Sequence, residues 1–135
     1  MPYEFFEHEA DVGIRGIGSS MEQAFESAAE ALFEVMADVK KIVPLKTVEL
    51  ECEASNIEEL FVEWLNRLLS EATINDMLFS RFMVKIEGNK LIGNAKGEPI
   101  AEKHALKTEV KAATYSQLKV LKKGDRFIAQ CIVDV

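Results

Sequence analysis

The second half of the chain most constrains the fold, because strand-like segments follow one another there with only short turns between them. Residues 81–98 read as two strands on either side of Gly88-Asn89, and the last residues, up to 135, read as two strands joined across Gly124-Asp125. Turns this short connect antiparallel neighbours, whereas parallel strands need a long crossover. The sequence therefore predicts an antiparallel sheet over most of its second half.

The stretch of residues 18–38 predicts the first of two amphipathic helices. Its apolar side chains recur at helical spacing, and Ser19 or Ser20 can begin a capping box that a residue three positions later completes. Another face carries a row of glutamates at i, i+4 spacing: Glu22, Glu26, Glu30 and Glu34. Because like charges at this spacing repel mildly, the row is either a solvated face, which is the commoner case, or a surface for a basic partner.

A second helix is predicted in residues 56–72. Asn56 is a good N-cap, and the helix carries a wide apolar stripe that needs a sheet or another helix against it: Leu60, Phe61, Trp64, Leu65, Leu68 and Leu69. One strand is expected between Tyr3 and Ile14, and another between the helices in residues 47–54. The order strand, helix, strand, helix and four strands favours a single α+β domain over residues 1–135, with mostly antiparallel sheets and two main helices packed on them.

Composition narrows the class of protein. The chain has 135 residues, of which 48% are apolar, and this suffices for a core without disulfides or a structural metal. It lacks an export signal at its start and any apolar run long enough to span a membrane, so we expect a cytoplasmic protein with reduced Cys52 and Cys131. A net charge of -7 without a basic stripe argues against direct nucleic-acid binding, so a role in RNA chemistry would run through a protein partner.

Two aspartates in apolar surroundings are candidate metal ligands. Asp11 lies in a stretch that otherwise looks buried, and Asp134 ends an apolar strand beside the terminal carboxylate of Val135. A buried carboxylate must be solvated, paired or metal-bound. If the last strand lies near the first, these groups could offer three oxygen ligands to one Ca²⁺, Mg²⁺ or Mn²⁺. A turn-capping aspartate and a solvated chain end explain the same pattern.

Other residues with useful chemistry are scattered. His8 and His104 could each bind a metal or carry a proton, although a lone histidine is more often packed or solvated. Lys111 stands among strand residues, where it could equally protect a sheet edge. The chain has no P-loop, no dinucleotide-binding glycine motif, no nucleophile elbow and no HExxH, so its residues by themselves identify no enzyme.

Several motifs in combination resemble those of the archease family. They include "EHEADVG" at residues 7–13, "EVKAATY" at 109–115 and the terminal "DV", and the resemblance runs along the whole chain in the family's order. It implies an α+β fold with sandwich-like sheets. It also implies a protein that is not itself an enzyme but activates the RtcB-type RNA ligase of tRNA splicing and RNA repair, by promoting GTP-dependent guanylylation of the ligase and multiple turnover.

The resemblance implies a divalent metal site as well. Its ligands are Asp11, Asp134 and Val135, with calcium as the first expected occupant and magnesium or manganese as alternatives. A lysine that matters in the family corresponds to Lys111 as first choice or to Lys103 as second. No catalytic residue, direct nucleic-acid contact or membrane contact is implied.

The chain departs from the family pattern at two positions. Glu9 stands where threonine is common, and Ser116 stands where histidine is frequent. Two competing readings are open: a stand-alone metal-dependent phosphoester hydrolase centred on Asp11, Asp134 and His8, and a chaperone-like binding module. The hydrolase needs a substrate pocket and a base that the sequence does not show.

Overall fold

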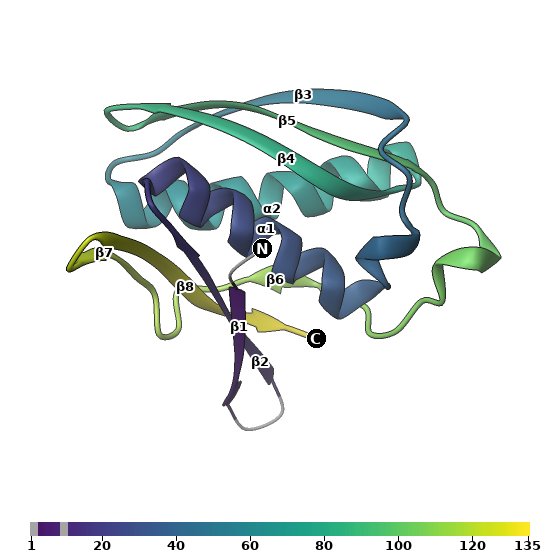
Figure 1. The fold of residues 1–135 in the computed structure, drawn as a ribbon, viewed down its shortest axis with the longest axis horizontal. Helices are drawn as coiled ribbons and strands as arrows, with labels where there is room; N and C mark the ends of the chain where they lie inside the picture. Colours follow the sequence, from purple (N-terminus) through teal and green to yellow (C-terminus); the bar gives the residue numbers. More distant parts are fainter. Residues whose placement is uncertain (1–2, 9–10) are drawn as a thin grey trace.

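Two helices lie between two β-sheets in the computed structural model, which describes residues 3–8 and 11–135 (Figure 1). Helix α1 spans Met21–Met36 and helix α2 spans Ile57–Asn75, and each contacts strands of both sheets. The predicted α+β class, with two main helices and mostly antiparallel sheets, is confirmed. The helices form a middle layer, so a sheet covers them on either side.

The larger sheet has five strands in the order β1-β2-β8-β6, with β7 also paired to β8. Its members are β1 (Tyr3–His8), β2 (Asp11–Gly18), β6 (Ala112–Ala113), β7 (Lys119–Lys123) and β8 (Arg126–Asp134). The smaller sheet has the order β3-β5-β4, and its members are β3 (Lys46–Glu53), β4 (Met77–Glu87) and β5 (Lys90–Pro99). Two short 3₁₀ turns complete the chain: η1 (Val39–Lys41) and η2 (Glu102–His104).

The start of the chain differs from the prediction of one strand between Tyr3 and Ile14. It forms two strands, β1 and β2, which pair antiparallel with His8 opposite Asp11. Residues 9–10, between the two strands, lie outside the described residues. Apolar residues recur before and after the connection, as at Phe5, Val12 and Ile14, so the apolar pattern does not reveal where one strand ends and the next begins.

Both helices begin where their capping residues predict. The Ser20 hydroxyl accepts the Gln23 N–H at 3.1 Å, and the Gln23 side chain in turn accepts the Ser19 N–H at 3.0 Å. Asn56 caps α2 by accepting the Glu59 N–H at 2.9 Å. The turn between β4 and β5 is also confirmed, with Gly88 at a φ of 60° that glycine adopts without steric cost.

The row of glutamates on α1 is neither a fully solvated face nor an open docking surface. The Glu26 carboxylate accepts the Val84 N–H of β4 at 2.9 Å, and the Glu34 carboxylate accepts the Val39 N–H at 3.2 Å. Partial burial raises the pKa of the Glu26 carboxyl. Two members of the row therefore satisfy backbone amides of neighbouring elements, a role that the spacing in the sequence did not indicate.

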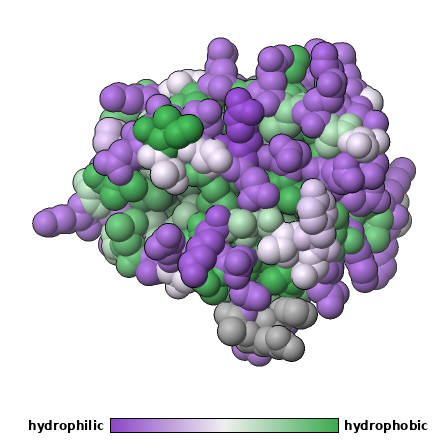
Figure 2. Space-filling model, turned by 180° about the vertical axis from the view of Figure 1, so that it is seen from behind, coloured by the Kyte–Doolittle hydropathy of each residue, from purple (hydrophilic) through white to green (hydrophobic). Residues whose placement is uncertain are grey.

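The core lies between the sheets and around the two helices. Trp64 of α2 is fully buried and donates its indole N–H to the Phe25 carbonyl of α1 at 3.0 Å. Seen from behind, the surface mixes hydrophilic side chains with smaller hydrophobic groups (Figure 2). Neither helix combines the length and the apolar character that a membrane crossing requires, within the part of the chain that the structure describes.

Candidate functional site

Asp11 and Asp134 come to the same end of the larger sheet. Strands β2 and β8 run antiparallel, and the last paired positions at this end are Val12 and Val133. The next residue on each strand is an aspartate, so the register sets Asp11 and Asp134 opposite each other. Asp11 is half-buried and Asp134 is exposed. Two residues that are 123 positions apart in the sequence thus become neighbours across two strands.

The end of β8 is supported from its other side by β6. Ala112 pairs with Asp134, and the Lys111 N–H donates to the Asp134 carbonyl at 2.8 Å. Helix α2 fixes β6 in turn, because the Asn66 side chain accepts the Ala113 N–H at 2.8 Å and donates to the Ala113 carbonyl at 3.2 Å. Backbone pairing on both sides therefore holds Asp134 in place.

The groups at this sheet end suit a hard cation, since carboxylate and main-chain oxygens are the ligands that Ca²⁺, Mg²⁺ and Mn²⁺ prefer. Among the described residues, no three or more His, Cys, Asp or Glu side chains gather closely enough to hold a metal. A site here would therefore add main-chain or terminal oxygens to the two aspartates. Val135, the third predicted ligand, packs partly against the core directly after Asp134. The side chain of His8, which pairs with Asp11, lies outside the description.

The two candidate lysines lie in different places. Lys111 is exposed and immediately precedes β6, which begins at Ala112. The prediction that Lys111 lies within a strand is therefore wrong. It lines a hollow of about 580 Å³ beside α2 together with Asn66 and Glu109. Lys103 and His104 belong to η2, in the light-green segment at the right of Figure 1, whereas the C-terminus lies near β1 and β2. The structure therefore joins the Lys111 backbone to that of Asp134, whereas Lys103 and His104 lie in a different segment.

A buried charged cluster surrounds Glu98 at the end of β5. Glu98 is 6% exposed, and its carboxylate accepts three hydrogen bonds: from the Val43 N–H at 2.7 Å, the Lys103 ammonium at 2.9 Å and His104 Nε2 at 2.9 Å. His104 Nδ1 accepts the Ala101 N–H at 2.9 Å, so its proton resides on Nε2 and the ring is neutral. These donors, with the bond from His104 foremost, lower the pKa of Glu98 from 4.5 to about 2.

The sequence singled out Lys103 and His104 but not Glu98. In "GNAKGEP" the glutamate follows a strand pattern in which charged residues normally face solvent, so nothing in its surroundings marked it. Its partner Val43 is 55 positions away. The cluster ties the segment after η1, the turn η2 and the end of β5 together, and none of its members is one of the aspartates.

Comparison with known proteins supports the resemblance seen in the motifs. The model of the Archease protein family (MTH1598/TM1083) matches residues 3–135. The chain belongs to the archease family. A protein archease from Pyrococcus abyssi is 43% identical over 139 residues, and one from Sulfurisphaera tokodaii is 41% identical over 136 residues. Each alignment covers 98% of both chains.

Solved structures agree with the archease fold. The solution structure of Methanobacterium thermoautotrophicum protein 1598 is similar to this archease with a TM-score of 0.88 and 36% identity, over 98% of each chain. A crystal structure from Thermotoga maritima, described as an archease and possible chaperone, has a TM-score of 0.60 and 24% identity, over 96% of this chain and 94% of that one. The second likeness concerns the fold alone.

Proposed function

We propose that this archease activates an RtcB-type RNA ligase by promoting its GTP-dependent guanylylation and multiple turnover. The observation that carries the proposal is the meeting of Asp11 and Asp134 at one supported end of the sheet. Two carboxylates held on paired strands form a preorganised acceptor set, which suits the positioning of charge in a phosphoryl-transfer site. Membership of the archease family adds to the argument.

The proposed site holds one divalent cation between Asp11, Asp134 and the oxygens of Val135, with calcium as the expected occupant. A bound cation would supply positive charge for phosphate oxygens. The protein's own contribution is rigidity, because β2 and β6 flank the end of β8 and Asn66 fixes β6. Backbone pairing therefore fixes the main chain that carries the two aspartates.

Lys111 is the first choice for the functional lysine. Its N–H binds the Asp134 carbonyl, so the lysine is anchored at the same sheet end as the aspartates. Lys103 forms an ion pair with Glu98 instead. The Lys111 side chain is exposed, so its ammonium can contact a phosphate of the partner's nucleotide, whereas the Lys103 ammonium is partly neutralised by Glu98. We therefore expect a larger loss of activation from Lys111→Ala than from Lys103→Ala.

The proposal is tested by multiple-turnover joining of RNA with a 3′-phosphate to RNA with a 5′-hydroxyl, using the cognate ligase, GTP and Mn²⁺. The wild-type protein should raise turnover beyond a single round, and Asp11→Asn and Asp134→Asn should abolish most of this gain. Asp125→Asn is the matched control, because Asp125 lies exposed in the β7–β8 turn. Calorimetric titration with Ca²⁺ should show binding to the wild type and to the control, but not to the Asp11→Asn and Asp134→Asn variants.

Three results would contradict the proposal. Unchanged ligase turnover with folded wild-type protein would remove the activator role. Phosphoester hydrolysis by the protein alone with Mg²⁺ or Mn²⁺ would favour the hydrolase. Metal-independent protection of unrelated proteins from aggregation would favour the chaperone-like module.

A further inference from the structure

The two edge strands of the smaller sheet, β4 and β3, differ in whether another element hydrogen-bonds their outward-facing backbone groups. At the β4 edge, the Glu26 carboxylate of α1 binds the outward-facing Val84 N–H at 2.9 Å. At the β3 edge, no hydrogen bond from the described residues reaches the backbone groups that face away from β5. An unpaired edge is a template for another strand. The β3 edge is therefore open to pairing, while α1 obstructs the β4 edge.

The open edge carries a regular row of negative charge. Glu49, Glu51 and Glu53 are exposed at alternate positions of β3, so they share the outer face of the sheet. Within the described part of the chain, no ion pair involves any of the three. Farther along the edge, Glu59 and Glu63 of α2 line a hollow of about 440 Å³ with Glu53. Carboxylates therefore accompany β3 along much of its length.

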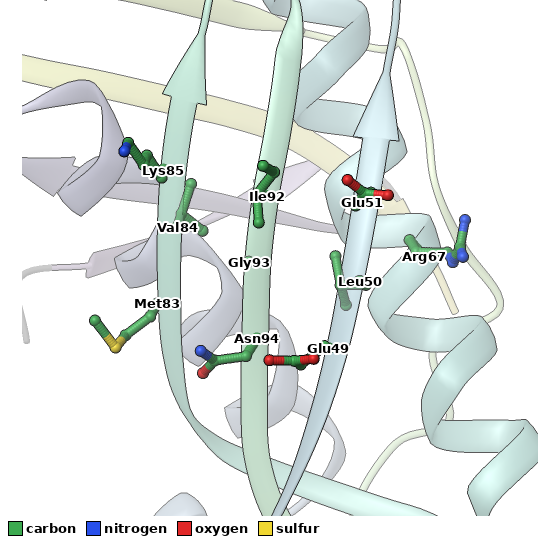
Figure 3. A pocket seen from close by; sticks show the side chains of 10 residues that line it. All are labelled: Glu49, Leu50, Glu51, Arg67, Met83, Val84, Lys85, Ile92, Gly93 and Asn94. Atoms are coloured by element: carbon green, nitrogen blue, oxygen red, sulfur yellow. The ribbon is translucent and has the colours of Figure 1, made fainter.

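Apolar side chains stand next to this acidic row on the same face. Met83 is 63% exposed and Ile92 is 58% exposed, and both line a hollow of about 560 Å³ together with Glu49 and Glu51 (Figure 3). Strand pairing brings these apolar side chains beside the glutamates. Glu51 pairs with Ile92, and Asn94 lies between Glu49 and Met83 and pairs with both. The face thus combines an open backbone edge, an acidic border and exposed apolar groups.

We propose that the β3 edge docks an extended segment of the partner ligase, which adds to the sheet as a strand and carries lysine or arginine at alternate positions. Strand addition supplies backbone hydrogen bonds, and alternate side chains supply specificity. The period of two in Glu49, Glu51 and Glu53 matches the period of side chains along an added strand. The partner's identity rests on the proposed function, whereas the edge and its charge do not.

Charge argues against two other occupants. A nucleic acid would bring phosphates against the carboxylates of β3. A second copy that paired through the same edge about a two-fold axis would set Glu49, Glu51 and Glu53 of one copy beside those of the other, and like charges opposite each other are destabilising. A basic segment instead gains from the same row.

The test compares Glu51→Lys with the matched control Glu87→Lys. Both residues are exposed glutamates of the same sheet, but Glu87 lies on β4 at the opposite edge. The dissociation constant of the complex with the cognate ligase is measured by calorimetry at low and high salt. Glu51→Lys should weaken binding about tenfold at low salt and less at high salt, while Glu87→Lys should change it by no more than about twofold.

Amide hydrogen exchange provides a second readout, since an added strand would hydrogen-bond the unpaired backbone amides of β3 and slow their exchange. Binding of the ligase should slow exchange along β3 and leave β4 unchanged. Glu51→Gln separates loss of attraction from added repulsion, and circular dichroism checks that each variant is folded. Suppose that the wild type activates the ligase, that Glu51→Lys binds the ligase as tightly as the wild type does, and that ligase binding does not protect β3. The docking proposal is then wrong, and the proposed function stands.

Two further outcomes keep the proposals apart. If the wild-type protein neither binds nor activates the ligase, the proposed function itself fails. If Glu51→Lys alters self-association in sedimentation experiments but leaves ligase binding intact, the edge belongs to a second copy and the docking proposal is overturned.

Discussion

Glu98 is a carboxylate that the fold removes from water and surrounds with donors. A backbone amide, an ammonium and a neutral imidazole each reach it within 2.9 Å. Removal of one partner from such a cluster leaves a buried charge short of hydrogen bonds, which is more harmful than the loss of an exposed ion pair. Lys103 is 51% exposed at its side chain, so the cluster reaches solvent on that side.

The stability that Glu98 contributes should depend on pH in a defined direction. Its pKa is lowered in the folded state from 4.5 to about 2, so the charged form is favoured by folding. The contribution is therefore fully present above about pH 4.5 and is lost as the pH falls through about 2. The free energies of unfolding of the wild type and Glu98→Gln, measured with urea, should differ by a constant amount at higher pH. This difference should shrink towards pH 2. Glu102→Gln, which changes an exposed glutamate four positions away, is the control variant.

Strand β2 lies closely against helix α1 at Gly16. A Cβ atom on Gly16 would collide with the Ala24 carbonyl and with Ala28, so the strand can approach the helix only without a side chain there. The same strand pairs with β8 and carries Asp11 at its start. The approach of β2 to α1 therefore helps to set the position of the candidate metal site.

Gly16→Ala should be strongly destabilising, because backbone atoms of a packed helix cannot move aside. We expect a loss of about 1–3 kcal/mol or more of unfolding free energy, measured by urea denaturation. Gly124→Ala is the comparison: its Cβ would meet nothing within 4 Å, but φ is 67°. That strain should cost about 1 kcal/mol. A Gly16→Ala variant as stable as the wild type would show that β2 and α1 are not so closely packed.

The whole molecule is a layer of helices enclosed by two sheets, and its core contains both cysteines. Cys52 and Cys131 are free and buried, one in each sheet. Burial raises the pKa of the Cys52 thiol to about 11 and that of Cys131 to about 12. Since the thiolate is the reactive form, both cysteines should be inert in the folded protein.

Thiol labelling should therefore report global unfolding. At mildly alkaline pH the native protein should react slowly with an aromatic disulfide reagent, at a rate that follows the unfolding equilibrium across a urea series. Both thiols should react at once in concentrated denaturant, which serves as the control. Rapid labelling of either cysteine without denaturant would mean that a sheet opens locally.

Local sequence patterns determined the helices, their caps and the turns at Gly88 and Gly124. These features depend on residues within a few positions of one another, so spacing alone identifies them. The same patterns missed the division into β1 and β2 and the two-residue strand β6. Strand β6 forms because Ala112 pairs with Asp134 and the Asn66 side chain bonds Ala113. A segment whose structure depends on distant residues shows no regular spacing of apolar residues in its own sequence.

For the candidate site, the sequence determined which residues stand out, and only the tertiary structure decided which of them meet. Asp11 and Asp134 were exceptional among apolar neighbours, yet their register depends on the pairing of β2 with β8. In the sequence Glu98 looks like an ordinary exposed glutamate, whereas in the fold it is buried between the segment at Val43 and the turn η2. Residue type limits the chemistry available at each position, but burial and hydrogen-bond partners arise from contacts between residues far apart in the chain.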